Sequence, residues 1–122
     1  MTLRILVCGG RNYFKREVVV EKLDGMLKHW GVEVVIHGGA TGADSLAAWW
    51  AERRDIPCLR VPAEWSKLGR KAGPIRNALM LRLGQPNLVL AFPGGMGTRN
   101  MTDQAIAAGI AVEWAPEDEL PE

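Results

Sequence analysis

The sequence predicts an α/β domain in which helices cover both faces of a parallel β-sheet. Five short apolar runs alternate with four segments of helical periodicity, an order that is typical of parallel sheets. Ten of the 14 glycines lie in the loops that follow the first four apolar runs. The 122 residues are sufficient to bury one hydrophobic core, so we expect a single domain over residues 1–122 with an acidic, solvated tail from about 116 to 122.

The five strands are predicted from short runs of aliphatic and β-branched residues, each followed closely by glycine or proline. Because polar residues do not alternate with apolar ones in these runs, they fit strands that are buried on both faces. Right-handed crossovers leave few topologies for this order of elements, and we expect a Rossmann-like, doubly wound sheet. The runs are residues 3–8, 33–37, 58–61, 87–92 and 110–114.

Four helices are expected between the strands. The first ends at Gly31, a favoured position for glycine after a helix, and its apolar residues recur at the spacing of one helix face. These residues are Val20, Leu23, Leu27 and Trp30. The other helices are expected over residues 43–54, 74–84 and 98–108, the third of the four beginning at a proline, which is favoured in the first helical position.

Composition and charge exclude several classes of protein. Lysine and arginine number 15 against 14 acidic residues, so the chain lacks the basic excess of a protein that coats nucleic acid. The longest apolar run, residues 88–92, is far shorter than the ~20 residues of a membrane span. The N-terminus does not have the pattern of a signal peptide. We therefore expect a cytoplasmic protein without a membrane partner.

The two cysteines do not predict a metal site. Cys8 and Cys58 lie far apart in the chain, and only His29 and His37 could join them as ligands. We expect both thiols to be reduced and to lie in the core, and we expect neither a metal ion nor a cofactor.

The glycines after the strands predict an anion site. In an open α/β sheet the carboxyl ends of the strands share one edge, and ligands bind there. Glycine lets backbone N–H groups approach a ligand, and the N-terminus of the following helix adds partial positive charge. Tight turns between strand and helix also favour glycine for geometric reasons alone. The ten glycines are Gly9, Gly10, Gly38, Gly39, Gly42, Gly69, Gly73, Gly94, Gly95 and Gly97.

Basic residues gather in the same loops and in the first helical turns after them. This clustering favours a local positive field for a small anion, although a solvated rim is the simpler alternative. No loop has the GxGxxG spacing or the Walker lysine, so a conventional NAD dehydrogenase is not expected. The basic residues are Arg11, Lys15, Arg16, Lys67, Arg70, Lys71, Arg76 and Arg99.

Three segments together resemble the SLOG superfamily. Residues 38–44 read GGATGAD, residues 72–80 read AGPIRNALM and residues 92–98 read FPGGMGT. This superfamily is the Rossmann-like group that holds the LOG-type nucleotide phosphoribohydrolases and the DprA-like proteins, and the first two segments are similar to its YspA-like branch. The resemblance spans residues 3–114 and implies a nucleotide-derived ligand and a homodimer.

The resemblance also implies a place for the phosphate, at the start of the last helix. There Thr98 would either cap the helix or donate its hydroxyl to the phosphate. In LOG enzymes a catalytic glutamate follows three residues later, where this chain has Met101, and Asn77 stands where they carry a lysine after an arginine. LOG-type chemistry therefore depends on another carboxylate in this chain.

Asp44 is the best candidate for that carboxylate. Cleavage of an N-glycosidic bond passes through an oxocarbenium-like state that a carboxylate stabilises. Asp44 lies in the first turn of the second helix, directly after the GGATG loop, where it either serves this chemistry, holds ribose hydroxyls or pairs with free backbone amides. Glu64 and Asp103 are weaker candidates, and Arg76 would contact the phosphate or form a surface ion pair.

The long connection over residues 62–73 is a candidate binding loop. Trp65 within it would either stack on a nucleobase or anchor the loop to the core. Trp49 and Trp50 project about 100° apart on the second helix, so one helix face cannot easily bury both. We expect one of them inside and the other partly exposed or covered by a second subunit.

Three functions follow from these observations. The first is binding, for sensing or processing, of a nucleotide-derived ligand with a phosphate; the second is N-glycosidic hydrolysis of such a ligand. The third, binding of single-stranded nucleic acid, is disfavoured by the near-zero net charge. Asp44 and Arg76 are the candidate catalytic residues. The candidate binding residues are Gly9, Gly10, Arg11, Gly38, Gly39, Thr41, Gly42, Trp65, Arg76, Asn77, Pro93, Gly94, Gly95, Gly97 and Thr98.

Overall fold

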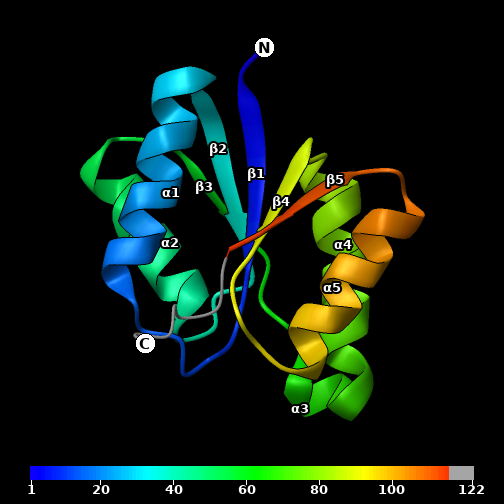
Figure 1. Ribbon diagram of the computed structural model, residues 1–122. Coiled ribbons are helices and arrows are strands. Elements are labelled where there is room, and N and C mark those ends of the chain that lie inside the picture. The colour runs from blue at the N-terminus through cyan, green and yellow to red at the C-terminus, as the bar shows by residue number, and fades with distance from the viewer. Residues whose placement is uncertain (116–122) are drawn as a thin grey trace, which may run out of the picture.

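A computed structural model, which describes residues 1–115, confirms the predicted parallel sheet (Figure 1). The predicted tail at 116–122 lies outside the described residues. All neighbouring strands pair in parallel, in the order β3-β2-β1-β4-β5, with β1 at the centre. The strands are β1 (Leu3–Cys8), β2 (Val32–His37), β3 (Cys58–Arg60), β4 (Leu88–Ala91) and β5 (Ala111–Trp114).

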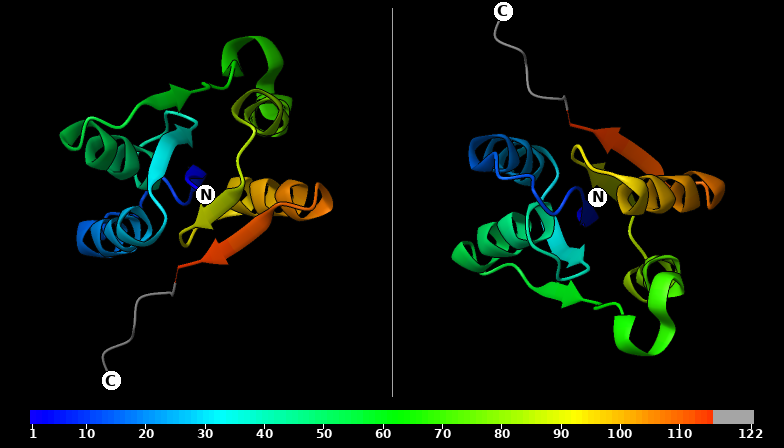
Figure 2. Two further views of the ribbon diagram at one scale, coloured as in Figure 1. Left: turned by 90° about the horizontal axis from the view of Figure 1, so that it is seen from above. Right: turned by 90° about the horizontal axis from the view of Figure 1, so that it is seen from below.

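Helices cover both faces of the sheet (Figures 1 and 2). Helices α1 (Arg16–His29) and α2 (Ala43–Arg53) lie on one face, and α4 (Ala72–Gly84) and α5 (Met96–Ala107) lie on the other. Because β1 pairs with both β2 and β4, the loops after β1 and β4 lead to opposite faces of the sheet. Ligand sites of doubly wound sheets form at this switch point.

Two helices begin earlier than the sequence predicts. Helix α4 begins at Ala72 and α5 at Met96, in each case two residues before the predicted start. Pro74 is compatible with the third position of α4 because the first N–H groups of a helix have no partner within it. The long connection before α4 also contains two short elements, α3 (Trp65–Leu68) and the 3₁₀ turn η1 (Gly69–Lys71).

The buried face of α1 differs from the prediction. Val19, Leu23 and Met26 are buried, whereas Val20 and Leu27 are only partly covered. Trp30 is 55% exposed because it follows the last helical residue, where the backbone has already left the helical path. The buried stripe is therefore displaced by one residue from the predicted one.

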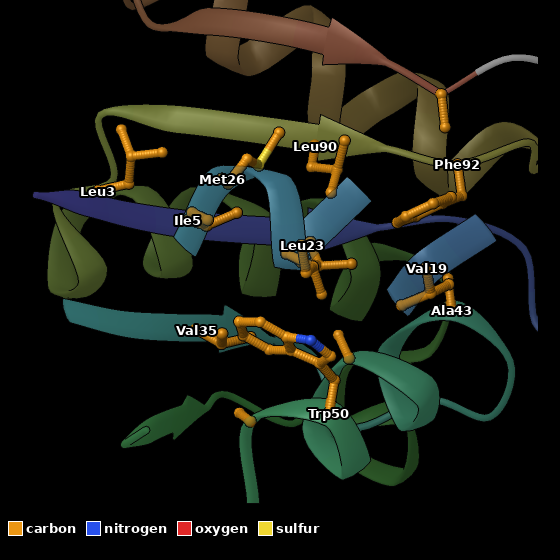
Figure 3. Packing of buried hydrophobic residues seen from close by; sticks show 14 of the residues in the cluster. Leu3, Ile5, Val19, Leu23, Met26, Val35, Ala43, Trp50, Leu90 and Phe92 are labelled. Atoms are coloured by element: carbon orange, nitrogen blue, oxygen red, sulfur yellow. The ribbon is translucent and has the colours of Figure 1, made fainter. Parts of the chain in front are cut away.

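Trp50 is the largest fully buried side chain and lies between α2 and the sheet, against Val35 and Leu23 (Figure 3). Its indole N–H donates to Asp24 Oδ1 at 2.8 Å, and Arg54 forms an ion pair with the same oxygen at 2.9 Å. A buried indole is stable when its N–H has such a partner. Trp50 therefore connects the two helices of this face with the sheet.

Trp49 is the partly exposed member of the tryptophan pair. The guanidinium groups of Arg16 and Arg53 each lie 5.3 Å from its ring centroid, a geometry that favours cation–π attraction. Two arginines of the same chain thus cover much of the ring. The homodimer stays a prediction.

The prediction that both cysteines lie in the core is correct for Cys8 and wrong for Cys58, which is exposed. Cys58 begins β3, a strand of three residues at the edge of the described sheet, so no further strand of that sheet lies beside it.

Among the residues that the structure describes, no helix is long and apolar enough to cross a membrane.

We predict that Trp50→Ala lowers the free energy of unfolding by about 3–5 kcal/mol, because it removes the largest buried side chain and leaves a cavity. Urea denaturation monitored by circular dichroism measures the change. Trp30→Ala is the matched control, since its exposed ring predicts a loss below about 1 kcal/mol. Equal losses for the two variants would contradict the packing described here.

Candidate functional site

A cleft of about 810 Å³ lies at the carboxyl edge of the sheet, a size typical of small-molecule sites. Its walls come from the loops after β1, β2 and β4, from α3, and from the beginnings of α4 and α5. The structure brings ten predicted site residues into its lining: Gly9, Gly10, Arg11, Asp44, Trp65, Arg76, Asn77, Gly95, Gly97 and Thr98. The lining does not include Gly38, Gly39, Thr41, Gly42, Pro93 and Gly94.

Gly10 joins the three glycine-rich loops to one another. Its N–H donates to the carbonyl of Pro93 at 2.8 Å, and its carbonyl accepts the N–H of Ala43 at 3.2 Å. A Cβ on Gly42, which has a φ of +81°, would collide with the Gly10 carbonyl, and a Cβ on Gly94 would collide with the Thr98 hydroxyl. Gly42 and Gly94 therefore allow close packing of the loops and do not line the cleft.

Asp44 closes the loop between β2 and α2. Its Oδ2 accepts two backbone N–H groups, from Gly38 at 3.0 Å and from Ala40 at 3.2 Å. Burial raises the pKa of Asp44, and the two N–H groups and the positive charge of Arg76 partly oppose that rise. Oδ2 therefore pairs with backbone amides, as one alternative expected, although these amides belong to the loop and not to the first turn of α2.

The second oxygen of Asp44 is open to the cleft. Oδ1 has no hydrogen-bond partner among the described residues. Every fully buried side-chain nitrogen or oxygen in the described part of the chain has a partner, so Oδ1 is in contact with solvent. Because Asp44 is only 7% exposed and lines the cleft, this contact is through the cleft.

Arg76 braces the same loop from α4. Its Nη1 donates to the Gly38 carbonyl at 3.0 Å, and its Nε donates to Asn77 Oδ1 at 2.9 Å. Burial lowers the pKa of Arg76, although the Asp44 charge opposes this effect. Among residues 1–115 Arg76 has no ion-pair partner, so the expected surface ion pair of Arg76 does not form there, and Nη2 is the nitrogen that its hydrogen bonds leave unused.

A chain of amides connects α4 with α5. Asn77 Nδ2 donates to Asn100 Oδ1 at 3.0 Å, and Gln104 Nε2 donates to the same oxygen at 2.8 Å. Gln104 Nε2 also donates to the carbonyl of Pro74 at 3.1 Å. A guanidinium can only donate and a carbonyl can only accept, so Arg76 at one end and Pro74 at the other determine the orientation of every amide.

The sequence analysis missed Asn100, which lines the cleft. Because the network occupies its Oδ1, the NH₂ group of Asn100 is the part that is free to meet a ligand. Its position one helical turn after Gly97 was the signal that could have identified it.

The beginning of α5 presents open backbone to the cleft. Gly95 precedes the helix, and a Cβ on Gly95 or Gly97 would meet no atom within 4 Å. Thr98 is the third helical residue and does not cap the helix, so the capping alternative is wrong. Thr98 is 7% exposed and lines the cleft, and its hydroxyl has no partner among the described residues.

Trp65 stands at the mouth of the cleft. Trp65 is 47% exposed, so about half of its surface is covered and the rest is open. The Arg11 guanidinium lies 5.5 Å from its ring centroid, and a Cβ on Gly73 would touch the ring at 3.3 Å. Of the eight predicted basic residues, Arg11, Arg70 and Arg76 line the cleft.

The floor of the cleft is apolar. Met101, at the position of the LOG glutamate, is fully buried and lies beside Met80. Burial also raises the pKa of the Cys8 thiol on this floor to about 12.

Neither of the two weaker carboxylate candidates lies in the cleft. Glu64 and Asp103 are both exposed and outside the lining. Asp44 is the one carboxylate among the lining residues. In the described part of the chain, no group of three or more His, Cys, Asp or Glu could hold a metal ion.

Comparisons with known proteins agree with this fold. The profile of the YspA, cpYpsA-related SLOG family (YAcAr) matches residues 3–68. The Gene 61 protein of Mycobacterium phage D29 is 39% identical over 118 residues, which cover 89% of this chain and 93% of that protein. The X-ray structure of DNA processing protein A (DprA) from Streptococcus pneumoniae matches 98% of this chain with a TM-score of 0.76 at 19% identity. The chain spans 52% of that DprA chain, and the likeness is one of fold.

His37, the last residue of β2, makes the stability of the loop depend on pH. Its Nδ1 accepts the N–H of Gly39 at 3.0 Å, so this nitrogen carries no proton in the folded chain. Burial, together with the charges of Arg60 and Arg76, lowers the pKa of His37 from its ordinary value of 6.5. The unfolded chain therefore binds the proton more tightly than the folded chain does.

We predict that the free energy of unfolding decreases as pH falls below about 6.5, with a slope from this one group of at most about 1.4 kcal/mol per pH unit. His37→Asn should reduce the slope, because an amide oxygen can accept the Gly39 N–H without titrating. Urea denaturation at pH 7.5 and at pH 5.5 measures this change in the free energy of unfolding with pH. His29→Asn, at an exposed position, should leave the slope in place. An unchanged slope in His37→Asn would refute the assignment.

Proposed function

The chain belongs to the YspA, cpYpsA-related SLOG family, and we propose that it binds a nucleotide-derived small ligand with a phosphate in this cleft. The observation that carries the proposal is the beginning of α5. There the first N–H groups of a twelve-residue helix, two glycines without side-chain cover and the unpartnered hydroxyl of Thr98 meet at one wall of the cleft. Such an arrangement favours an anion.

Positive charge supports the same ligand. Arg76 and Arg70 line the cleft beside the beginning of α5, and Arg11 lies at its mouth. A guanidinium can bind two phosphate oxygens at once, so Arg76 Nη2 can reinforce the helix N–H groups. The chain has a net charge of only +1, so this positive field is local.

The rest of the cleft suits an apolar, planar group. Met80, Met101 and Val7 form an apolar surface, and the exposed face of Trp65 stands at the mouth. An aromatic ring can stack on any nucleobase, because every base has a flat π-face. A nucleoside phosphate combines the two features, with its phosphate at α5 and its base near Trp65.

Hydrolysis of the ligand has less support than binding. Glycoside cleavage usually relies on two carboxyl groups, and Asp44 is the one carboxylate of the lining. The methionine at the position of the LOG glutamate cannot activate water. If the chain were a hydrolase, Asp44 would have to act alone.

Native mass spectrometry tests the proposal in one experiment. The full chain is incubated with AMP, ADP-ribose, NAD and a short single-stranded oligonucleotide, and bound and cleaved masses are followed over time. We expect an intact nucleotide on the protein. Free base above one equivalent would instead identify a hydrolase. Preference for the oligonucleotide, with affinity that falls steeply with salt, would favour nucleic acid as the partner.

We predict that Gly95→Asp weakens binding of the retained nucleotide about 100-fold or more, because a carboxylate beside the phosphate repels it by several kcal/mol. The added side chain has open space, so the variant should fold. Gly25→Asp, on α1, adds the same charge at another open position and should not change the affinity. Isothermal titration calorimetry measures both, and equal affinity for the two variants would exclude α5 as the phosphate site.

We predict that Trp65→Ala weakens nucleotide binding about tenfold, because stacking contributes roughly 1–3 kcal/mol per base. Binding of ribose 5-phosphate, which has no base, should not change. Trp114→Ala removes a similarly exposed tryptophan from β5, outside the cleft, and serves as the control. If ribose 5-phosphate and the nucleotide lose affinity equally, Trp65 does not contact the base.

A further inference from the structure

We infer that the cleft selects a ligand whose sugar carries a 2′-hydroxyl group, which donates a hydrogen bond to Oδ1 of Asp44. The cleft would therefore prefer a ribonucleotide to its 2′-deoxy form. This inference rests on the proposed function and specifies the sugar of the ligand. It follows from the hydrogen-bonding atoms that α4 and α5, and separately α2, leave unused in the lining of the cleft.

Helices α4 and α5 offer hydrogen-bond donors to the cleft. The amide network leaves the NH₂ group of Asn100 unused, and the bonds of Arg76 leave Nη2 unused. The Thr98 hydroxyl and the first N–H groups of α5 belong to the same lining. A phosphate, which has only acceptor oxygens at its charged end, is matched to these donors.

Helix α2 offers a strong hydrogen-bond acceptor to the cleft, the carboxylate of Asp44. Oδ2 of Asp44 is occupied by the N–H groups of Gly38 and Ala40, so only Oδ1 can meet the ligand. Its solvent contact is through the cleft, because every fully buried polar side-chain atom in residues 1–115 is paired. A carboxylate there repels phosphate and requires a donor from the ligand.

Asp44 and Arg76 do not neutralise each other directly. Both line the cleft and each bonds to Gly38, but no ion pair joins them in the described part of the chain. The carboxylate therefore keeps its capacity to accept from a third group. A sugar hydroxyl suits this position because it is uncharged and donates one hydrogen bond.

The chemistry of Asp44 also provides a clean variant. In Asp44→Asn, the two loop N–H groups require the amide oxygen, so the NH₂ group replaces Oδ1 on the cleft side. The acceptor for the hydroxyl becomes a donor while the loop keeps its bonds. Glu52→Gln removes the same charge from an exposed position of α2 and is the matched control.

The experiment compares four pairs of nucleoside monophosphates by isothermal titration calorimetry on the full chain: AMP, GMP, CMP and UMP, each with its 2′-deoxy form. The best-bound base should bind at least tenfold more tightly as the ribonucleotide, since a hydrogen bond to a charged group contributes about 1.5–3 kcal/mol. In Asp44→Asn we expect this ratio to fall about fivefold, because the hydroxyl can then only accept a weaker bond from the neutral NH₂ group, and in Glu52→Gln we expect the ratio to be unchanged.

Each outcome bears on one claim. Equal affinity of the ribo and deoxy forms for the wild-type chain would overturn the inference and leave the proposed function in place. A ratio that survives in Asp44→Asn would overturn the assignment to Asp44. If no monophosphate of either sugar binds, the inference fails, and the proposed function fails with it when ADP-ribose and NAD do not bind either. The wild-type comparison needs no variant, so the test stands even if Asp44→Asn does not fold.

Discussion

The cleft depends on the backbone of Gly10. Its N–H and carbonyl bond to Pro93 and Ala43, so that the loops after β1 and β4 and the beginning of α2 are held together at one point. Glycine at positions 42 and 94 allows this approach, because a side chain at either would meet the neighbouring loop. The glycine content of the chain therefore reflects loop packing as much as ligand access, and only Gly95 and Gly97 combine open space with a place in the lining.

The charged side chains that hold the loop after β2 also line the cleft. Gly38 donates its N–H to Asp44 and accepts Arg76 at its carbonyl, so two opposite charges hold one loop from its two sides. Asp44 bonds to the loop through Oδ2 and Arg76 bonds to it through Nη1, while Asp44 Oδ1 and Arg76 Nη2 stay free for the cleft. Burial raises the pKa of Asp44 and lowers that of Arg76, and each charge opposes the shift of the other. The loop is therefore held in place by side chains of the chain itself.

The sequence was sufficient to predict the sheet, the cleft edge and half of the lining, because strand runs and glycine loops are local signals. It failed where the outcome depends on neighbours distant in sequence. The NH₂ group of Asn100 is left free in the cleft only because Asn77 and Arg76 of α4 fix the direction of the amide network. Cys58 is exposed because β3 lies at the sheet edge, and Trp30 because the helix has ended. The place of a strand in the sheet and the point at which a helix ends cannot be read from local periodicity alone.

The distribution of carboxylates separates retention of the proposed ligand from its cleavage. A site that cleaves a glycosidic bond needs one group to stabilise positive charge on the sugar and another to activate water or protonate the leaving base. Here the position of the LOG glutamate holds a buried methionine that is part of the core beside β4. Asp44 has one free oxygen, and a hydroxyl held there occupies it. For the ligand proposed above, this chemistry favours retention over cleavage.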